Sequence, residues 1–212
     1  ERSLDRVQRA YGSGKRFAIY NTEYGYLTSP PKHPTRKTPI ISTTTAGLFL
    51  NQAEYMSWRD PRMKSFSQYL LADPVVPKLS NDYGGFASGL LDYKHRAKPT
   101  YDAWRLPLYL PRTSGRSGGS LEVWGCARPV FSARMDVPAD TQTVAIQFKP
   151  DSGGGFSTVK SQTITDPHGY FDTRINLRSS GTVRLAYTYP ADDPLLSPSS
   201  TVHSRSVHVK LT

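Results

Sequence analysis

Apolar side chains recur at every second position in several short stretches of the C-terminal part of the chain, and this pattern restricts the fold most strongly. Strict alternation is typical of strands that bury one face. The turn-forming sequences DSGGG, DPHG and SSG separate the stretches, as hairpin connections do. The alternating residues are Val144, Ile146 and Phe148; Phe171, Thr173, Ile175 and Leu177; Val183, Leu185, Tyr187 and Tyr189; and Val207, Val209 and Leu211. Residues 121–212 are therefore predicted to form an immunoglobulin-like antiparallel β-sandwich of about six or seven strands.

The first half of the chain has a different order, in which expected helices and strands alternate. The expected helices cover residues 3–11, 42–60 and 99–106, and the expected strands cover residues 16–22 and 63–73. Ser and Thr caps precede the second helix, Asp60-Pro61 ends it, and Pro99 opens the third. This alternation predicts an α/β domain built from parallel βα units.

A segment rich in Gly, Ser and Arg separates the two patterns. Residues 113–120 belong to the sequence PRTSGRSGGS, which has no periodic apolar residue. Such a composition is typical of a linker. We therefore expect two domains, residues 1–112 and 121–212, in a chain of 212 residues that is long enough to bury two cores.

The composition argues against several classes of function. The net charge of +10 comes from Lys and Arg scattered along the chain, with one small cluster, PPKHPTRK, and no interleaved aromatic residues, so nucleic acid is not an expected partner. The five histidines do not stand at metal-ligand spacing and Cys126 is the single cysteine. Neither a metal nor another cofactor is therefore expected. No apolar run is long enough to span a membrane.

Glu23 ends the first expected strand, in the sequence FAIYNTEYG. Because side chains alternate along a strand, Ile19, Asn21 and Glu23 are expected on the same face. In parallel βα folds, the carboxyl ends of the strands carry the chemistry, since the loops that follow them are free to vary. A solvated glutamate that merely begins a loop is the alternative interpretation.

Three phrases carry a family resemblance: AIYNTEYGYLTSPP, DPRMKSFSQYLLADP and GGFASGLLDYKHRAKPTYDAWRLPLYLP. Together they resemble the C-terminal part of a bacterial retaining glycoside hydrolase of the cellulase-like clan A, whose fold is a (β/α)8 barrel. In that clan the seventh strand ends in the nucleophilic glutamate, often within T-E-Y/F-G, and this position falls on Glu23. The eighth strand commonly ends in an aromatic residue, often Trp, with Asp four positions later. Tyr69 and Asp73 match that spacing, with Tyr in place of Trp.

The resemblance implies a fold and an activity. Residues 1–112 would be the final βα units of a TIM barrel, and the sandwich would be an accessory domain. The enzyme would be secreted and would cleave O-glycosidic bonds of oligo- or polysaccharides by double displacement, with Glu23 as the nucleophile and no cofactor. The residues expected to bind substrate beside it are Tyr24, Tyr26, Gln68, Tyr69 and Asp73.

The acid/base glutamate of such a site is missing from the expected elements. In the clan it closes the fourth strand after an asparagine, whereas Thr22 separates Asn21 from Glu23 here. The chain opens at Glu1 on what looks like the end of a helix, so we expect a fragment or a processed chain. The rest of the barrel is expected upstream in the same polypeptide or as a docked chain, because two barrel strands alone leave open edges.

Two other functions remain open from the sequence. The chain could be a non-catalytic carbohydrate-binding or structural module, in which Glu23 is only a ligand contact or a solvated residue. A basic adhesion or nucleic-acid-binding protein is the third hypothesis, and it would require binding to polyanions with a steep salt dependence.

Overall fold

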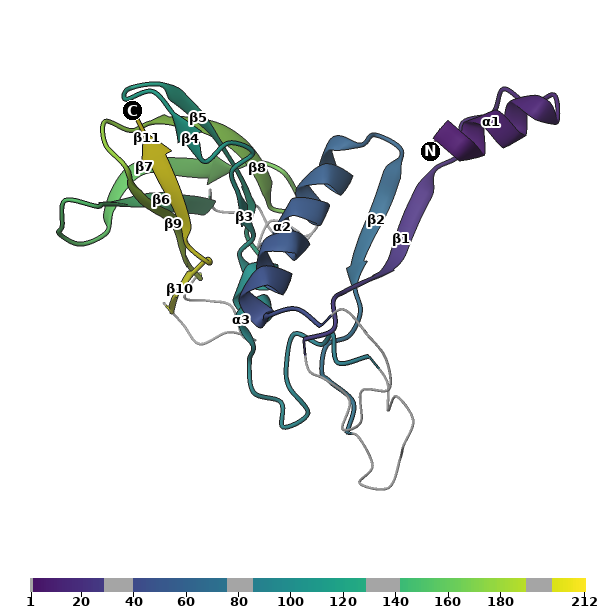
Figure 1. Cartoon of the computed structure of the whole chain (residues 1–212), viewed down its shortest axis with the longest axis horizontal. Coiled ribbons are helices and arrows are strands. Elements are labelled where there is room, and N and C mark those ends of the chain that lie inside the picture. The colour runs from purple at the N-terminus through teal and green to yellow at the C-terminus, as the bar shows by residue number, and fades with distance from the viewer. Residues whose placement is uncertain (1, 29–39, 76–85, 129–141, 190–199) are drawn as a thin grey trace.

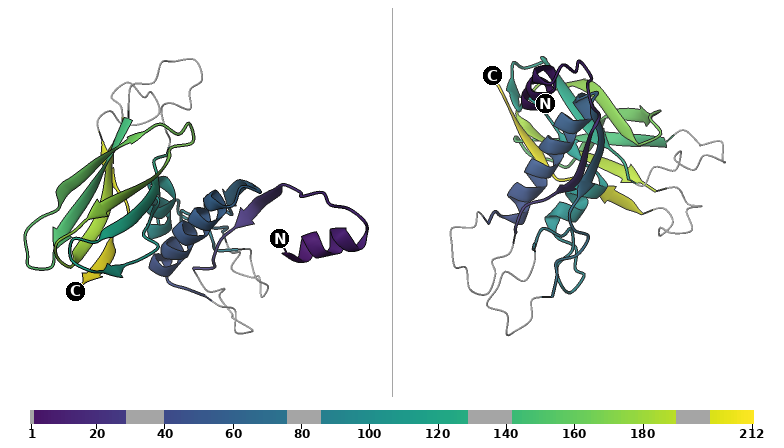
Figure 2. Two further views of the ribbon diagram at one scale, coloured as in Figure 1. Left: turned by 90° about the horizontal axis from the view of Figure 1, so that it is seen from above. Right: turned by 90° about the vertical axis from the view of Figure 1, so that its right-hand side faces the viewer.

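The computed structural model describes residues 2–28, 40–75, 86–128, 142–189 and 200–212. They form two parts, an α/β unit toward the N-terminus and a β-sandwich toward the C-terminus (Figure 1). Helix α2 (Thr43–Arg59) lies between the sandwich and the strands of the α/β unit (Figure 2). The chain therefore has mixed α/β content, with strands more numerous than helices.

The α/β unit is built on a parallel pair of strands, β1 (Ile19–Tyr24) and β2 (Met63–Gln68). Helix α2 connects them, which makes a βαβ unit, and the short helix α3 (Pro99–Arg105) packs against α2. The expected order of helices and strands is confirmed. Helix α1 (Arg2–Ala10) extends away from the body and has no buried residue. No helix in the described part of the chain is long and apolar enough to cross a membrane.

Local sequence fixes both ends of α2. The Ser42 side chain accepts a hydrogen bond from Thr45 N at 3.0 Å, which is a typical N-cap. The helix ends at Arg59 and Asp60 is its C-cap, because Pro61 disfavours a helical conformation in the residue before it. Both boundaries agree with the prediction from the sequence.

The β-sandwich consists of two sheets. One has the strand order β4-β11-β9-β6-β7, with β10 also paired to β9, and the other has the order β3-β5-β8. All strand pairs are antiparallel except β4 with β11. The strands are β3 (Leu108–Tyr109), β4 (Ser114–Gly115), β5 (Ser120–Cys126), β6 (Gln142–Pro150), β7 (Ser157–Ile164), β8 (Tyr170–Asn176), β9 (Gly181–Thr188), β10 (Thr201–His203) and β11 (Val207–Leu211).

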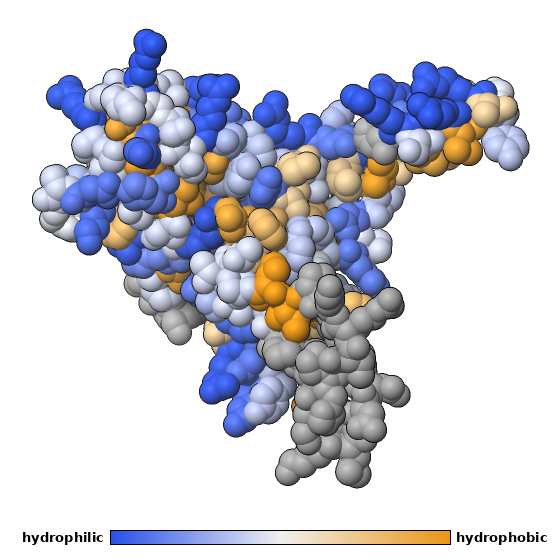
Figure 3. Space-filling model, in the orientation of Figure 1, coloured by the Kyte–Doolittle hydropathy of each residue, from blue (hydrophilic) through white to orange (hydrophobic). Residues whose placement is uncertain are grey.

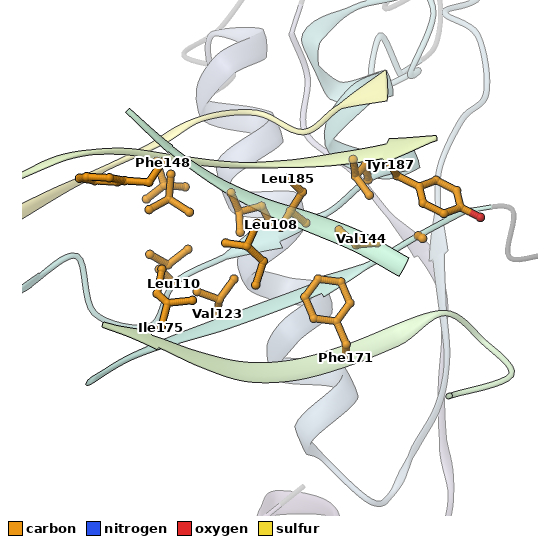
Figure 4. Close-up of a cluster of buried hydrophobic side chains, with 14 of the residues drawn as sticks. Leu108, Leu110, Val123, Val144, Phe148, Phe171, Ile175, Leu185 and Tyr187 are labelled. Carbon is orange, nitrogen blue, oxygen red and sulfur yellow. The ribbon is translucent and has the colours of Figure 1, made fainter. Parts of the chain in front are cut away.

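The hydrophobic core of the sandwich lies between these sheets (Figure 4). Val144 and Leu185 from one sheet and Val123 and Phe171 from the other point toward one another and are buried. The alternating positions predicted from the sequence therefore do form the buried face. An alternating strand needs a second sheet to cover it, and this chain provides one.

The prediction of a linker at residues 113–120 is wrong. Ser114 and Gly115 form β4 and pair in parallel with the last strand. Gly118 has a φ of +73°, which a residue without a Cβ adopts readily, and its N–H bonds to Leu177 O at 2.7 Å. The sandwich also begins earlier than expected, because β3 at Leu108 pairs with β5.

Buried polar contacts join α2 to the sandwich. Asn51, which is fully buried in α2, accepts a hydrogen bond on Oδ1 from Arg205 Nε at 2.8 Å. One turn later, Glu54 forms an ion pair with Arg128 and accepts a hydrogen bond from Tyr170 Oη at 3.0 Å. The helix that leads from β1 to β2 is therefore fixed against the second part of the molecule.

Candidate functional site

The carboxyl ends of β1 and β2 meet at one end of the parallel pair. Glu23 lies there on β1, and Tyr69, which directly follows β2, donates its backbone N–H to Tyr24 O at 2.8 Å. Glu23 is exposed, and within the described part of the chain its carboxylate has no hydrogen-bond or ion-pair partner. A carboxylate in this setting is available to a ligand.

A bulge in β1 sets the direction of Glu23. Asn21 pairs with Phe66 and Tyr24 pairs with Gln68. An advance of three residues along β1 therefore matches an advance of two residues along β2, which is a β-bulge. Paired residues in a parallel sheet point to the same face, which places Asn21 and Tyr24 together. The expectation that Asn21 and Glu23 share a face is therefore wrong. Glu23 lies within the bulge and is exposed, whereas Asn21 and Tyr24 are half-buried.

Tyr24 and Tyr26 face helix α2 instead of a substrate. The Tyr24 hydroxyl lies 3.1 Å from the Tyr26 hydroxyl and donates to Phe49 O of α2 at 3.3 Å. Burial raises the pKa of Tyr24 well above its usual value, and the neighbouring Tyr26 hydroxyl adds to this effect. The Tyr26 ring also packs on Phe49, at 5.3 Å between centroids. These placements argue against the predicted contact of either tyrosine with a sugar.

Gln68 and Asp73 are also committed to internal contacts. Gln68 Nε2 donates to Tyr69 O at 2.8 Å and to Ser88 O at 2.6 Å. Asp73 is buried, and Lys98 Nζ lies 2.9 Å from each of its carboxylate oxygens. The structure thus gives both residues a role in holding loops, where the sequence predicted substrate contacts.

Tyr69 keeps the position that the sequence predicted for it. It lies beside the end of β1 and is half-buried, and its ring makes an edge contact with Phe86 at 6.1 Å between centroids. Phe86 is 54 % exposed, so an apolar surface is available close to the end of the sheet. The sequence reasoning missed Phe86, and only the return of its segment to the end of β2 reveals it.

A pocket of about 660 Å³ lies beside β2, and neither Glu23 nor Tyr69 lines it. Five consecutive residues of β2, Met63–Ser67, line it together with residues from α2, α3 and the sandwich. In the described residues β2 pairs only with β1, so the pocket follows the unpaired edge of β2. We interpret the pocket as space beside an open sheet edge.

The described residues contain no group of three or more His, Cys, Asp and Glu side chains that could hold a metal ion. Cys126 is buried in the sandwich, and burial raises the pKa of its thiol far above the usual value. A buried neutral thiol is a poor nucleophile. Cys126 is therefore a poor candidate for nucleophilic chemistry.

Comparisons with known proteins give only weak similarities. No family model and no curated protein matches the chain. Among solved structures, a superoxide reductase (neelaredoxin) from Ignicoccus hospitalis is 8 % identical with a TM-score of 0.38, and covers 50 % of this chain and 80 % of its own. The corresponding protein from Archaeoglobus fulgidus is 10 % identical with a TM-score of 0.33, over 50 % of this chain and 89 % of its own.

β-Glucuronidase 2 from Bacteroides uniformis, covalently bound to an aziridine, is 13 % identical with a TM-score of 0.35. That match covers 100 % of this chain and 24 % of the glucuronidase. The chain is thus distantly similar, over its whole length, to part of a bacterial glycoside hydrolase. TM-scores of this size do not decide between the two kinds of protein.

Proposed function

We propose that the chain is the C-terminal part of a secreted retaining glycoside hydrolase, and that Glu23 is its catalytic nucleophile. One observation carries this proposal: the Glu23 carboxylate is exposed at the carboxyl end of a parallel βαβ unit and has no hydrogen-bond or ion-pair partner among the described residues. That end of a parallel sheet is where α/β enzymes place their reactive groups.

The proposed reaction is a double displacement. A Glu23 oxygen attacks the anomeric carbon, the glycosidic C–O bond breaks, and a second carboxyl group protonates the departing oxygen. The same second group then removes a proton from water, which attacks the anomeric carbon and releases Glu23. Tyr69, beside Glu23, would provide the face on which a sugar ring rests.

The second carboxyl group is proposed to come from polypeptide outside the described residues. It must lie about 5–5.5 Å from the nucleophile in a retaining enzyme. Asp73, which follows β2, is unsuitable because both of its oxygens bond to Lys98. The proposal therefore requires further barrel strands, in the same polypeptide or in a docked chain.

Exposed apolar surface supports such a requirement. Parallel sheets are normally covered on both faces, yet Phe17 and Tyr20 at β1 are 39 % and 64 % exposed. Helix α1 carries exposed Leu4 and Val7, and Figure 3 shows a hydrophobic lower side on this arm beneath a hydrophilic upper side. These surfaces are what additional strands and helices of a barrel would cover.

Retention of configuration tests the proposed reaction. The full-length protein is expected to hydrolyse a member of a panel of aryl glycosides, and proton NMR should show the first-formed sugar with the anomeric configuration of the substrate. Two displacements at one carbon restore the starting geometry, whereas a single displacement by water inverts it. An inverted product, or no turnover of any member of the panel, would contradict the proposal.

A further inference from the structure

A buried ion pair binds together the chain segments that follow the two parallel strands. Lys98 Nζ lies 2.9 Å from both carboxylate oxygens of Asp73 and 2.9 Å from the Thr28 hydroxyl. An ammonium group has three N–H donors, so these three partners use all of them. The side chains of Lys98 and Asp73 are 9 % and 7 % exposed, so solvent screens their attraction only weakly.

The three residues joined by these bonds come from separate segments of the chain. Thr28 follows β1, Asp73 follows β2, and Lys98 is the N-cap of α3. A fourth segment joins them, because Thr28 N donates to Ala87 O at 3.0 Å and Gly89 N donates to Asp73 Oδ1 at 2.8 Å. The ion pair is therefore the centre of the loops at the carboxyl end of the sheet.

The choice of lysine at this position is not explained by α3 itself. N-caps are usually Ser, Thr, Asp or Asn, and the helix dipole opposes a cation at the N-terminus. The Lys98 side chain makes no capping hydrogen bond. On the other side of the pair, a Cβ at Gly89 would lie 2.5 Å from Asp73 N, so the backbones are in close contact there. Tertiary contacts, and not helix formation, account for Lys98.

We propose that the Lys98–Asp73 pair is a positioning device for the site at Glu23. It fixes Thr28, five residues beyond Glu23, and Asp73, four residues beyond Tyr69, in one arrangement. The spacing between the nucleophile and the aromatic residue that faces the sugar depends on this arrangement. The pair acts through the segments that it holds, because its polar atoms bond within the chain. This inference rests on the proposed function for its catalytic meaning, but not for its structural test.

The double variant Lys98→Met/Asp73→Leu separates positioning from overall stability. It removes both charges together, so no unpaired charge is left buried, and such replacements are often close to neutral for stability. We expect urea unfolding to change little, while hydrogen exchange at the Thr28 and Gly89 amides accelerates by about tenfold or more. Exchange at Val144 in the sandwich core should not change. With aryl glycosides, kcat should fall more than KM rises.

Two further variants complete the test. Thr28→Val removes one bond of Lys98 without changing a charge, and should also accelerate exchange at the Thr28 amide. Arg96→Met removes the exposed Arg96–Asp92 pair from a neighbouring loop and should leave exchange unchanged. The positioning role is overturned if the double variant and Thr28→Val both keep wild-type exchange. Faster exchange in a protein without glycosidase activity would uphold the structural role and contradict only the proposed function.

Discussion

Glu23→Gln should lower kcat/KM for an aryl glycoside by on the order of 10⁴-fold or more in the full-length protein. Glutamine keeps the shape of the side chain but cannot form the glycosyl ester, so the first displacement stops. The Glu23 carboxylate makes no bond to the described residues, so the urea midpoint should stay at its wild-type value. The measurement is steady-state hydrolysis of the aryl glycoside on which the wild-type protein is most active.

Two control experiments show whether the fall in kcat/KM comes from the missing Glu23 carboxylate. Asp151→Asn changes an exposed carboxylate of the sandwich, which bonds His208 at 2.9 Å, and should leave kcat/KM unchanged. Glu23→Ala opens space beside the anomeric carbon, so added azide should restore turnover and yield a glycosyl azide of inverted configuration. A Glu23→Gln protein that keeps most of its activity would show that Glu23 is a solvated residue.

Arg128→Met should destabilise the fold by about 3–5 kcal/mol, because it leaves a buried carboxylate without its cation. Glu54 is 1 % exposed in α2 and pairs with Arg128, whose guanidinium also lies over Trp104 at 4.4 Å. Burial lowers the pKa of Arg128, but an arginine remains charged at neutral pH. Urea unfolding at pH 7 measures the loss.

The double variant Arg128→Met/Glu54→Leu provides the control for this loss. Without either charge it should regain much of the lost free energy of unfolding, since no ion stays buried alone. A loss below about 1 kcal/mol in Arg128→Met would mean that solvent already screens the pair. The sandwich would then hold α2 by its other contacts, such as Asn51 with Arg205.

Patterns that act along one element were readable from the sequence. Ser42 and Pro61 bracket α2, and the alternating residues of β6 and β9 are those that the second sheet buries. The order of helices and strands also predicted the parallel pairing of β1 with β2. In each case the signal lies within the segment that it describes.

Features that depend on a distant partner were not readable. The Gly- and Ser-rich residues 113–120 have the composition of a linker, but β11, at the other end of the chain, pairs with them. The bulge near Glu23 arises from the register between β1 and β2, which are about 40 residues apart, and it moved Asn21 to the opposite face. Local alternation cannot show a register shift.

Only part of the candidate site could be predicted from the sequence, because some of its contacts also depend on residues that are distant along the chain. Glu23 and Tyr69 lie where strand ends place them, whereas Tyr24 bonds to helix α2 and Gln68 bonds to Ser88 O in a loop. Asp73 was placed correctly beyond β2, but its partner Lys98 lies 25 residues further along the chain. A lysine just before the Pro99 that opens a helix is the one local sign of that pair.

The most direct test of the central claim is to trap the covalent intermediate. The full-length protein would be incubated with an activated 2-deoxy-2-fluoro glycoside of the sugar that it hydrolyses. The fluorine slows both displacements, whereas the activated leaving group keeps the first one fast, so the glycosyl ester accumulates. Peptide mass mapping should then find the fluoroglycosyl group on Glu23, in a peptide that carries TEYG. Label on a different carboxylate, or inactivation without any label on Glu23, would contradict the account.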